Sequence, residues 1–431
     1  MDNHKLDSNN SRAKTATVKA LCRLALVTVL VFPVIAGVDF FNHVQATELN
    51  ATFSGTTDLS KEDERMVDQL LEETLGINPA TIAKGQPELA KASIASGFSV
   101  YTGYGVENNI LNSDWLELDS PKYHSTADFF YSRKKNKKSN FNLYVFLNYS
   151  HYPDLDTESD RHELFTRAKG TFWIDDKNSL GAALSYLHQL SFDTDNTVED
   201  EPIPEYKNEE VVFSPFWERD LGSNCSIISE IELRHKETKE PTDNFDLFKL
   251  TAQFKKGYDK DSENRIVVDA GQTLYDEGEI LDLEGYPLEG TSLKTESLSL
   301  SLSNSHFWST NSVINLKSKL MALKQEDNGP GYYNYDYYYL EETLQIQWTD
   351  WKFSSTVSAT QYRYAERKSA SATGDSETIY NLLFEIDAVL ELKIGTDFLA
   401  KIEAVALQST SNDQSMEYSA DSILVGFFYY F

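Results

Sequence analysis

The sequence has little cysteine, few basic residues and only one long hydrophobic run. Its 431 residues include two cysteines, and 39 lysines and arginines stand against 68 aspartates and glutamates, a formal net charge of −29. Such a negative field repels nucleic acid, and no basic patch is large enough to reverse it, so a nucleic-acid partner is excluded. The one long apolar run, Leu24 to Val38, is too short for a comfortable helical membrane span.

The N-terminus has the layout of a secretory signal peptide. The apolar run follows a basic segment, and Val44-Gln45-Ala46 offers a small-residue cleavage site. The basic segment contains Lys5, Arg12, Lys14, Lys19 and Arg23. We therefore predict a signal peptide over residues 1–46, with a retained signal anchor as the alternative.

Cleavage changes the composition of the mature chain. Residues 1–46 carry five of the 39 basic and three of the 68 acidic residues, which leaves 34 and 65 and a net charge of −31. Because Cys22 is removed as well, Cys225 remains the only cysteine, and an intrachain disulfide is excluded.

From Ser93 onward, hydrophobic and polar residues alternate with a period of two. Leu298, Leu300 and Leu302, for example, alternate with serines on both sides, so one face is hydrocarbon and the other is hydroxyl. The same alternation recurs around Phe248 to Lys255, Ile314 to Leu320, Thr343 to Trp348 and Leu382 to Glu391. A sheet with charge on one face and hydrocarbon on the other requires two different solvents.

Counting these segments predicts sixteen strands, with an uncertainty of about two because strand limits are the weakest predictions. The predicted strands are 94–107, 124–133, 140–151, 162–174, 178–192, 208–219, 224–237, 244–257, 264–277, 292–304, 311–325, 335–348, 351–366, 376–390, 394–409 and 417–431. Strands this long are unusual in soluble sandwiches, and no fixed repeat period favours a solenoid.

The connections between the strands alternate between short and long. Tight polar turns are predicted at 175–177, 222–223, 259–263, 307–310 and 349–350, and longer acidic connections at 108–123, 193–207, 278–291, 326–334 and 367–375. Outer-membrane barrels have short periplasmic turns, longer extracellular loops and an even strand number. The sequence therefore predicts an all-β, transmembrane antiparallel up-and-down barrel over residues 93–431, located in the cell outer membrane among phospholipid and lipopolysaccharide.

Residues 47–92 show no strand pattern and instead predict one short helix. Ser60 can cap it, Gly76 ends it, and apolar residues lie between them at helical spacing. A short amphipathic helix forms no core alone. Over residues 60–75 it would hang in the periplasm, plug the barrel or bind a periplasmic protein partner, and a plain linker is the alternative.

The C-terminal strand resembles the insertion signal of bacterial outer-membrane barrels. Gly426 is followed three and five residues later by Tyr429 and Phe431, although Leu424 stands where that signal prefers a polar residue. The resemblance implies recognition by the barrel-assembly machinery. Alternation also predicts that Val425, Phe427, Tyr429 and Phe431 form one outward row, with Phe428 and Tyr430 facing inward.

The segment Tyr101 to Asn109 resembles the opening strand of surface-lipoprotein assembly modifiers and exopolysaccharide-export barrels. Those proteins carry helical repeats before the barrel, whereas this chain has one short helix there. The broader resemblance of residues 93–431 is to porins in size.

Charged residues at inward positions are candidate lumen-lining residues. They are Glu230, Glu232, Arg234, Lys249, Lys255, Asp269, Lys317, Lys319, Glu385, Asp387, Glu391, Asp397, Lys401 and Glu403. A barrel of sixteen strands leaves an aqueous channel unless it is plugged, and rows of opposite charge would sort polar solutes. The alternative is that these residues are merely solvated or paired with one another. The last three strands are acidic inside, which predicts a modest cation preference.

A tyrosine-rich segment follows Gly329-Pro330-Gly331. It contains Tyr332, Tyr333, Tyr335, Tyr337, Tyr338 and Tyr339. Aromatic residues at a loop-to-strand junction are typical of the interfacial girdle of a barrel, which is the favoured interpretation. Stacking on a sugar is the alternative.

Metal-site and catalytic motifs are weak or missing. The acidic stretch Asp193, Asp195, Glu199, Asp200, Glu201 and Glu205 lacks the ordered spacing of an EF-hand loop, so a charged surface loop is predicted. His124-Ser125, Ser305-His306 and His162-Glu163 are sequence neighbours on strands and point to opposite faces. There is no G-x-S-x-G or H-E-x-x-H motif. We predict no enzyme activity, cofactor or metal.

Two function classes remain open from the sequence. The first is a passive or weakly selective channel for small polar solutes or ions. The second is a non-conducting assembly, export or structural barrel whose N-terminal helix binds a partner or plugs the lumen. The longest extracellular connections, about sixteen residues, argue against a narrow constriction by one long loop.

Overall fold

The structure is a computed structural model of the chain, and it describes most of the region from residue 94 to residue 430. The described ranges are 94–108, 119–136, 138–153, 160–192, 205–239, 241–258, 262–283, 285–309, 313–368, 378–395, 397–413 and 416–430. The predicted signal peptide, the predicted helix at 60–75 and Phe431 lie outside these residues.

Sixteen strands form in the described ranges. They are β1 (Ile94–Asn108), β2 (Ser120–Asn136), β3 (Ser139–His151), β4 (Arg161–Trp173), β5 (Asn178–Phe192), β6 (Glu205–Gly222), β7 (Cys225–Thr238), β8 (Phe245–Gly257), β9 (Glu263–Tyr275), β10 (Lys294–Ser309), β11 (Val313–Asp327), β12 (Tyr335–Gln347), β13 (Trp351–Lys368), β14 (Thr378–Lys393), β15 (Phe398–Ser411) and β16 (Tyr418–Tyr430). A short 3-10 helix, η2 (Pro241–Asp243), precedes β8. No helix among the described residues is long and apolar enough to cross a membrane.

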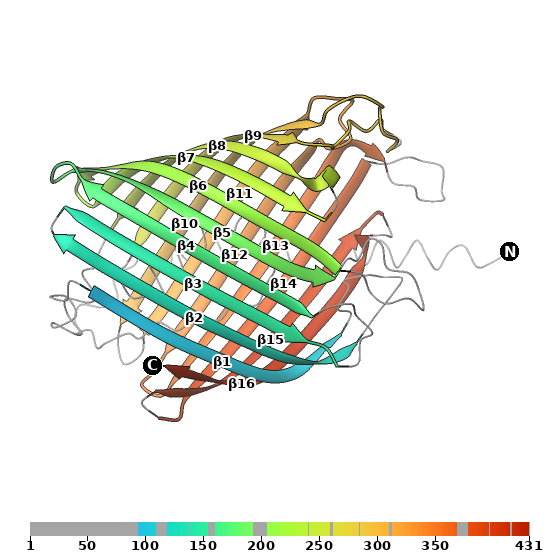
Figure 1. Ribbon diagram of the computed structural model, residues 1–431. Coiled ribbons are helices and arrows are strands. Elements are labelled where there is room, and N and C mark those ends of the chain that lie inside the picture. Colours follow the sequence, from blue (N-terminus) through green and yellow to red (C-terminus); the bar gives the residue numbers. More distant parts are fainter. Residues whose placement is uncertain are drawn as a thin grey trace, which may run out of the picture. The chain divides into compact units, whose positions relative to one another are not determined.

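The strands close into an up-and-down barrel. Each strand pairs in antiparallel fashion with its neighbours in sequence, and β1 closes the sheet on β16. The closing register runs from Ser99 opposite Tyr430 to Asn108 opposite Asp421. Figure 1 shows the tilted strands running around one closed wall. The predicted fold class and strand number are confirmed.

The barrel wall has an apolar outer face and a polar inner face. In β10, Leu298 is 60% exposed, whereas Ser299 beside it is 4% exposed. The concave side is identified by contacts between strands that are not neighbours, such as Glu107 on β1 with Arg161 on β4, 3.4 Å apart. Glu107 and Ser299 therefore face the lumen. The residues that the pairing register aligns with them, together with every second residue from there along each strand, face the lumen as well, and the exposed hydrophobic residues face outward.

The connections differ in length at the two ends of the barrel. At one end the strand limits leave two to five residues between paired strands, and at the other they leave six to eighteen. The longest connection, between β9 and β10, folds back on itself through a bridge of Leu281 with Pro287. Short turns on one side and longer loops on the other are the arrangement of outer-membrane barrels.

Three predicted strand limits were wrong by four or five residues. β2 begins at Ser120, not at 124, because residues 120–122 pair only with β1 and such an edge position tolerates Pro121. β10 continues to Ser309 through the predicted turn at 307–310. β15 begins at Phe398, because Ile394 and Gly395 donate their backbone N–H groups to the carbonyl of Phe398 in a turn.

Candidate functional site

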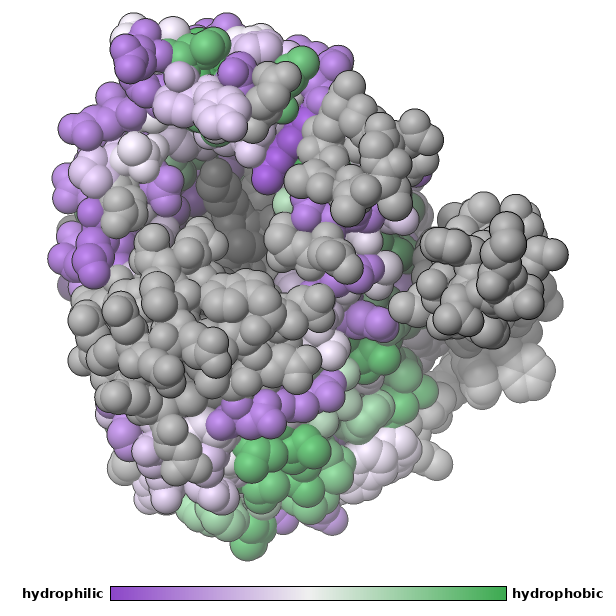
Figure 2. Space-filling view, turned by 90° about the vertical axis from the view of Figure 1, so that its right-hand side faces the viewer, coloured by the Kyte–Doolittle hydropathy of each residue, from purple (hydrophilic) through white to green (hydrophobic). Residues whose placement is uncertain are grey.

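The inner wall of the barrel is the candidate functional site, and its register positions most of the charged residues that the sequence singled out. Those on lumen-facing positions of β7 to β15 are Glu230, Glu232, Arg234, Lys249, Lys255, Asp269, Lys317, Lys319, Glu385, Asp387, Glu391, Lys401 and Glu403. Asp397 instead lies in the turn before β15, because that strand starts one residue later. Figure 2 shows the end of the barrel rimmed largely by hydrophilic residues.

A buried ion-pair network crosses β6, β7 and β8. Arg234 lies 3.0 Å from Glu210 and 3.1 Å from Glu232, and Lys249 also pairs with Glu232. The Arg234 and Glu232 side chains are only 2% and 5% exposed. Buried charges of opposite sign require each other, because an isolated one is costly to desolvate. These charges are therefore paired with one another inside the wall, and Arg234 and Glu232 are hardly accessible to a solute.

A second network lies at the long-loop end of β1 to β4, and the sequence did not single it out. Glu107 pairs with Lys122 at 2.6 Å and with Arg161 at 3.4 Å. The Tyr152 hydroxyl donates to Glu107 at 3.1 Å, and burial raises the pKa of Tyr152, which keeps this donor protonated. Alternation could have placed Glu107 and Lys122 inward, but their convergence with residues of β3 and β4 depends on the pairing register.

A third cluster packs where the first and last strands meet. Lys401 pairs with Glu403 at 2.5 Å, and both side chains are at most 3% exposed. The Lys401 ammonium also lies 5.0 Å from the ring centre of Tyr101 and 5.7 Å from that of Phe428. The centres of the Tyr101 and Phe428 rings are 4.9 Å apart. This seam cluster, defined as Tyr101, Lys401, Glu403 and Phe428, is packed as tightly as a protein core.

Glycines make room for the seam cluster. Gly103 and Gly426 lie opposite each other in the closing register. A Cβ atom on Gly426 would collide with the carbonyl oxygen of Thr102 and with the Tyr101 ring, and one on Gly103 would meet the Tyr101 hydroxyl. An aromatic ring over paired glycines covers backbone that would otherwise be exposed. Gly426, a residue of the predicted insertion signal, thus has a packing role in the folded barrel.

The other residues at the end of β16 divide between its two faces, as the alternation predicts. Val425, Phe427 and Tyr429 are outward and 51%, 46% and 42% exposed, whereas Phe428 is buried on the inner side. Phe427 stacks on Phe398 of β15 with ring centres 5.4 Å apart.

An acidic patch on the inner wall is formed by Glu341, Glu385 and Asp387. Glu341 and Glu385 lie in one row on either side of Ser358, and Asp387 follows Glu385 on the same face of β14. Among the described residues, neither Glu385 nor Asp387 forms an ion pair, in contrast to Glu391, which lies 3.7 Å from Lys352. In this patch, Lys319 lies opposite Glu341, whereas the carboxylates of Glu385 and Asp387 have no paired cation among the described residues.

Glu342 is the carboxylate next along β12 and points the other way. It accepts a hydrogen bond from the Ser318 hydroxyl at 2.8 Å on the outer face, beside the exposed Val357. It provides a carboxylate that is close to the acidic patch in sequence but separated from the lumen by the wall.

The tyrosine-rich segment lies mostly on the inner side. Tyr335, Tyr337 and Tyr339 occupy inward positions of β12, and Tyr338 alone among the β12 tyrosines is outward, 45% exposed, where a girdle residue would lie. Tyr332 and Tyr333 belong to the loop between β11 and β12. The sequence contains a signal for this orientation. Leu344 and Ile346 are outward residues, and alternation continued back along the strand from them puts Tyr339, Tyr337 and Tyr335 on the inner face.

A serine and a histidine meet on the inner wall without completing a catalytic arrangement. The Ser150 hydroxyl lies 2.9 Å from Nδ1 of His124, and both residues are buried. Nε2 of His124 has no hydrogen-bond partner among the described residues, so no carboxylate orients the ring. His124 and Ser125 point to opposite faces, as their register positions require.

Metal ligands do not cluster in the described part of the chain. No group of three or more histidine, cysteine, aspartate or glutamate side chains there is arranged to hold an ion. The acidic stretch from Asp193 to Glu201 lies outside the described residues, and Glu205 begins β6.

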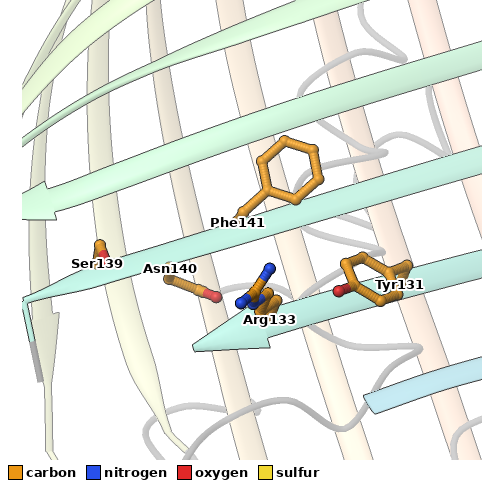
Figure 3. Close-up of a pocket in the computed structure, with 5 residues that line it drawn as sticks. All are labelled: Tyr131, Arg133, Ser139, Asn140 and Phe141. Atoms are coloured by element: carbon orange, nitrogen blue, oxygen red, sulfur yellow. The ribbon is translucent and has the colours of Figure 1, made fainter. Parts of the chain in front are cut away.

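A cavity of about 330 Å³ lies at the short-turn end of β2 and β3. It is lined by Tyr131, Arg133, Ser139, Asn140 and Phe141, and Figure 3 shows these side chains on the two neighbouring strands β2 and β3. Four of the five residues have outward register positions, and Phe141 is 42% exposed on that face. The cavity therefore belongs to the outer rim and not to the lumen.

Comparison with known proteins gives only distant structural matches. No protein-family model and no curated protein matches the chain. Among solved structures, OccAB1 of Acinetobacter baumannii is 7% identical with a TM-score of 0.44, over 78% of this chain and 96% of that chain. CdiB of the same organism is 9% identical with a TM-score of 0.44, over 78% and 60%. A loop-deletion mutant of OmpT, an outer membrane protein of Vibrio cholerae, is 10% identical with a TM-score of 0.37, over 79% and 100%.

These likenesses are too distant to add to what the barrel itself shows. The sheet has no open edge, so every strand pairs on both sides, as a membrane-spanning sheet must. Its outer face exposes large hydrophobic residues on strand after strand. Such a surface is unfavourable in water and favourable against lipid hydrocarbon. The chain is an outer-membrane β-barrel protein of sixteen antiparallel strands.

Proposed function

We propose that the barrel forms a water-filled channel for passive or weakly selective passage of small polar solutes or ions. The observation that carries the proposal is the mainly polar inner face of a closed sixteen-stranded wall, interrupted on β3 to β5 by an apolar cluster of Tyr144, Phe165 and Leu187. Barrels of eight strands are filled by their own side chains, whereas those of sixteen leave an aqueous passage. No chemical reaction is part of this function.

The charge distribution inside the barrel supports a modest preference for cations. Glu385 and Asp387 form no ion pair among the described residues, and Glu341 lies in the same acidic patch. Lys317 and Lys319 lie on β11 beside this patch, with Lys319 directly opposite Glu341. A field running from lysines to carboxylates would orient polar solutes, and the excess of acid would attract cations.

A non-conducting assembly, export or structural barrel is the second candidate. It is favoured by the tight packing of the seam cluster, where inward-facing Tyr101, Lys401 and Glu403 are almost inaccessible to solvent. In this function residues 60–75 would engage a periplasmic protein partner or plug the lumen. In either function, we infer that the barrel-assembly machinery recognises Gly426, Tyr429 and Phe431, and that lipid and lipopolysaccharide surround the wall.

Planar-bilayer recordings distinguish the two candidates. The refolded mature chain, residues 47–431, and a truncated form without residues 47–92 would each be added to a bilayer in potassium chloride. The channel function predicts discrete current steps in at least one form, and larger steps after truncation if the segment plugs the lumen. Silence of both forms, with insertion verified by resistance of the barrel to protease, would end the channel proposal.

A further inference from the structure

The inner wall carries a continuous track of tyrosines below the long-loop end. Tyr335 and Tyr337 on β12 meet Tyr362 and Tyr364 on β13, with ring centres 5.0 to 5.9 Å apart. Tyr339 continues the track along β12, with its ring 6.3 Å from that of Tyr337 and tilted by only 9°. These five residues are named the tyrosine track. All are partly exposed and have inward register positions.

The loop between β11 and β12 extends the track to the mouth and is held in one conformation. The Asp327 carboxylate accepts hydrogen bonds from the backbone N–H groups of Gly329, Gly331 and Tyr333 at 2.9, 3.1 and 2.8 Å. Gly331 has a φ of +105°, which favours glycine. Because the loop is fixed by these contacts, its aromatic residues are arranged before any ligand arrives, which lowers the entropic cost of binding.

An arginine joins the mouth to the track. The guanidinium carbon of Arg367 lies 4.7 Å from the ring centre of Tyr332 and 5.4 Å from that of Tyr364. Aromatic rings therefore follow one another from the loop into the lumen.

The rows of the wall along the track are uncharged, and charges lie against its two ends. Arg367 contacts Tyr364 at the mouth, and the Lys319 ammonium lies 5.1 Å from the ring centre of Tyr339 at the inner end. The pairing register aligns inward positions in rows around the barrel, and between β10 and β15 the three rows through Tyr335, Tyr337 and Tyr339 have only uncharged members. The other members are Ser297, Gln325 and Tyr364; Ser299, Leu323, Tyr362, Asn381 and Ser411; and Ser301, Met321, Thr360, Leu383 and Ser409. Charges begin in the next row, with Lys319, Glu341 and Glu385.

This combination defines the chemistry of a ligand. A flat aromatic ring offers an apolar face that can cover the C–H face of a sugar ring, while hydroxyl and amide groups beside it can exchange hydrogen bonds with the sugar hydroxyls. Between Arg367 at the mouth and Lys319 at the inner end, a charged solute would find no counter-charge among these rows and would have to give up hydration without compensation. A series of rings favours a ligand with repeating units.

We propose that the tyrosine track binds neutral, linear oligosaccharides. This inference rests on the proposed channel function and names the solute class that the channel would favour. The track tyrosines would contact the sugar faces, and the partly exposed amides of Gln325 and Asn381 would contact the hydroxyl groups.

Isothermal calorimetry on the mature chain in detergent micelles tests the proposal with maltohexaose as the probe. Saturable heat is expected for maltohexaose, and weaker binding for an oligogalacturonate of the same length, because the uncharged rows between Arg367 and Lys319 offer its carboxylates no counter-charge. Polyethylene glycol of similar size should give no saturable heat. No saturable heat with maltohexaose, or tighter binding of the charged oligosaccharide, would overturn the proposal.

The two faces of β12 provide matched variants. Tyr337→Ala should weaken maltohexaose binding about fivefold, Tyr337→Phe should retain most of it because the ring remains, and Tyr338→Ala should leave it unchanged because that ring is outward. Equal affinities for Tyr337→Ala and Tyr338→Ala would contradict the proposed site. Saturable binding to a barrel that carries no current would end the channel function and leave the saccharide site standing, whereas current without maltohexaose binding would do the reverse.

Discussion

At the scale of single residues, most charged side chains inside the barrel are paired with one another and are therefore less available to a solute. Arg234 forms ion pairs with Glu210 and Glu232, and Glu107 forms ion pairs with Lys122 and Arg161. Removing one partner of such a network leaves a charge buried without compensation, which costs far more than the net gain from forming the pair. Charges therefore divide into those that stabilise the wall and those that remain available to solutes.

Arg234→Met tests this division. The variant leaves Glu210 without its ion pair and Glu232 with Lys249 alone, and we expect a loss of about 3–5 kcal/mol in the free energy of unfolding. Urea titration of the refolded barrel in detergent micelles, followed by tryptophan fluorescence, measures it.

Lys255→Met is the matched control for Arg234→Met. Lys255 pairs with Glu263 at 2.7 Å, but both side chains are more than a quarter exposed. Its loss should cost at most about 1 kcal/mol. A similar loss in both variants would show that burial of the Arg234 network adds nothing to stability.

At the scale of strands, the period-two pattern was sufficient to predict sixteen strands, because each strand separates hydrocarbon from polar residues. It was not sufficient at Pro121, where an edge position allowed the strand to continue, or at Asp397, where a turn replaced the start of a strand. It also could not predict which charges meet. The contact of Lys401 with Tyr101 joins β15 to β1 across β16, so it depends on register and on side-chain length.

In the tyrosine-rich segment, composition and alternation predict different faces of the wall. A run of aromatic residues at a loop junction is typical of an outward girdle. The alternation set by Leu344 and Ile346 nevertheless places Tyr337 and Tyr339 on the opposite face from those residues, and the register agrees.

Two variants of β16 separate packing from recognition. Gly426→Ala introduces a Cβ against Thr102 and Tyr101, so we expect it to lower the stability of the refolded barrel by about 1–3 kcal/mol. Tyr429→Ala changes an outward ring and should alter stability little in micelles, but it should reduce the amount of barrel in the outer membrane of cells. Urea titration in micelles and membrane fractionation are the two measurements.

Gly170→Ala is the control for Gly426→Ala, because nothing lies within 4 Å of a Cβ atom at position 170. Its stability should equal that of the unaltered barrel. If Gly426→Ala is also neutral, the close contact at the seam has no energetic effect. If Tyr429→Ala reaches the membrane in normal amounts, that residue is not part of the insertion signal.

At the scale of the whole barrel, one wall separates two solvents. Hydrocarbon residues cover its outside, and mainly hydroxyl, amide and charged residues line its inside, beside the apolar cluster on β3 to β5. The same alternation that keeps the protein in the membrane therefore also lines most of the proposed channel. The uncharged tyrosine rows lie nearer the long loops, and the acidic patch begins one row further in. A solute entering from the long-loop end would thus meet the aromatic rings and Arg367 first and the acidic patch second.

The reversal potential of single channels under a potassium chloride gradient tests most directly whether the charged inner wall lines a conducting path. The unaltered barrel should give a cation-selective potential, and the double variant Glu385→Gln and Asp387→Asn should shift it toward zero. Glu342→Gln, a change to the carboxylate on the outer face of the neighbouring strand, should leave the potential unchanged. An anion-selective potential, or one that the double variant leaves where it was, would contradict the account.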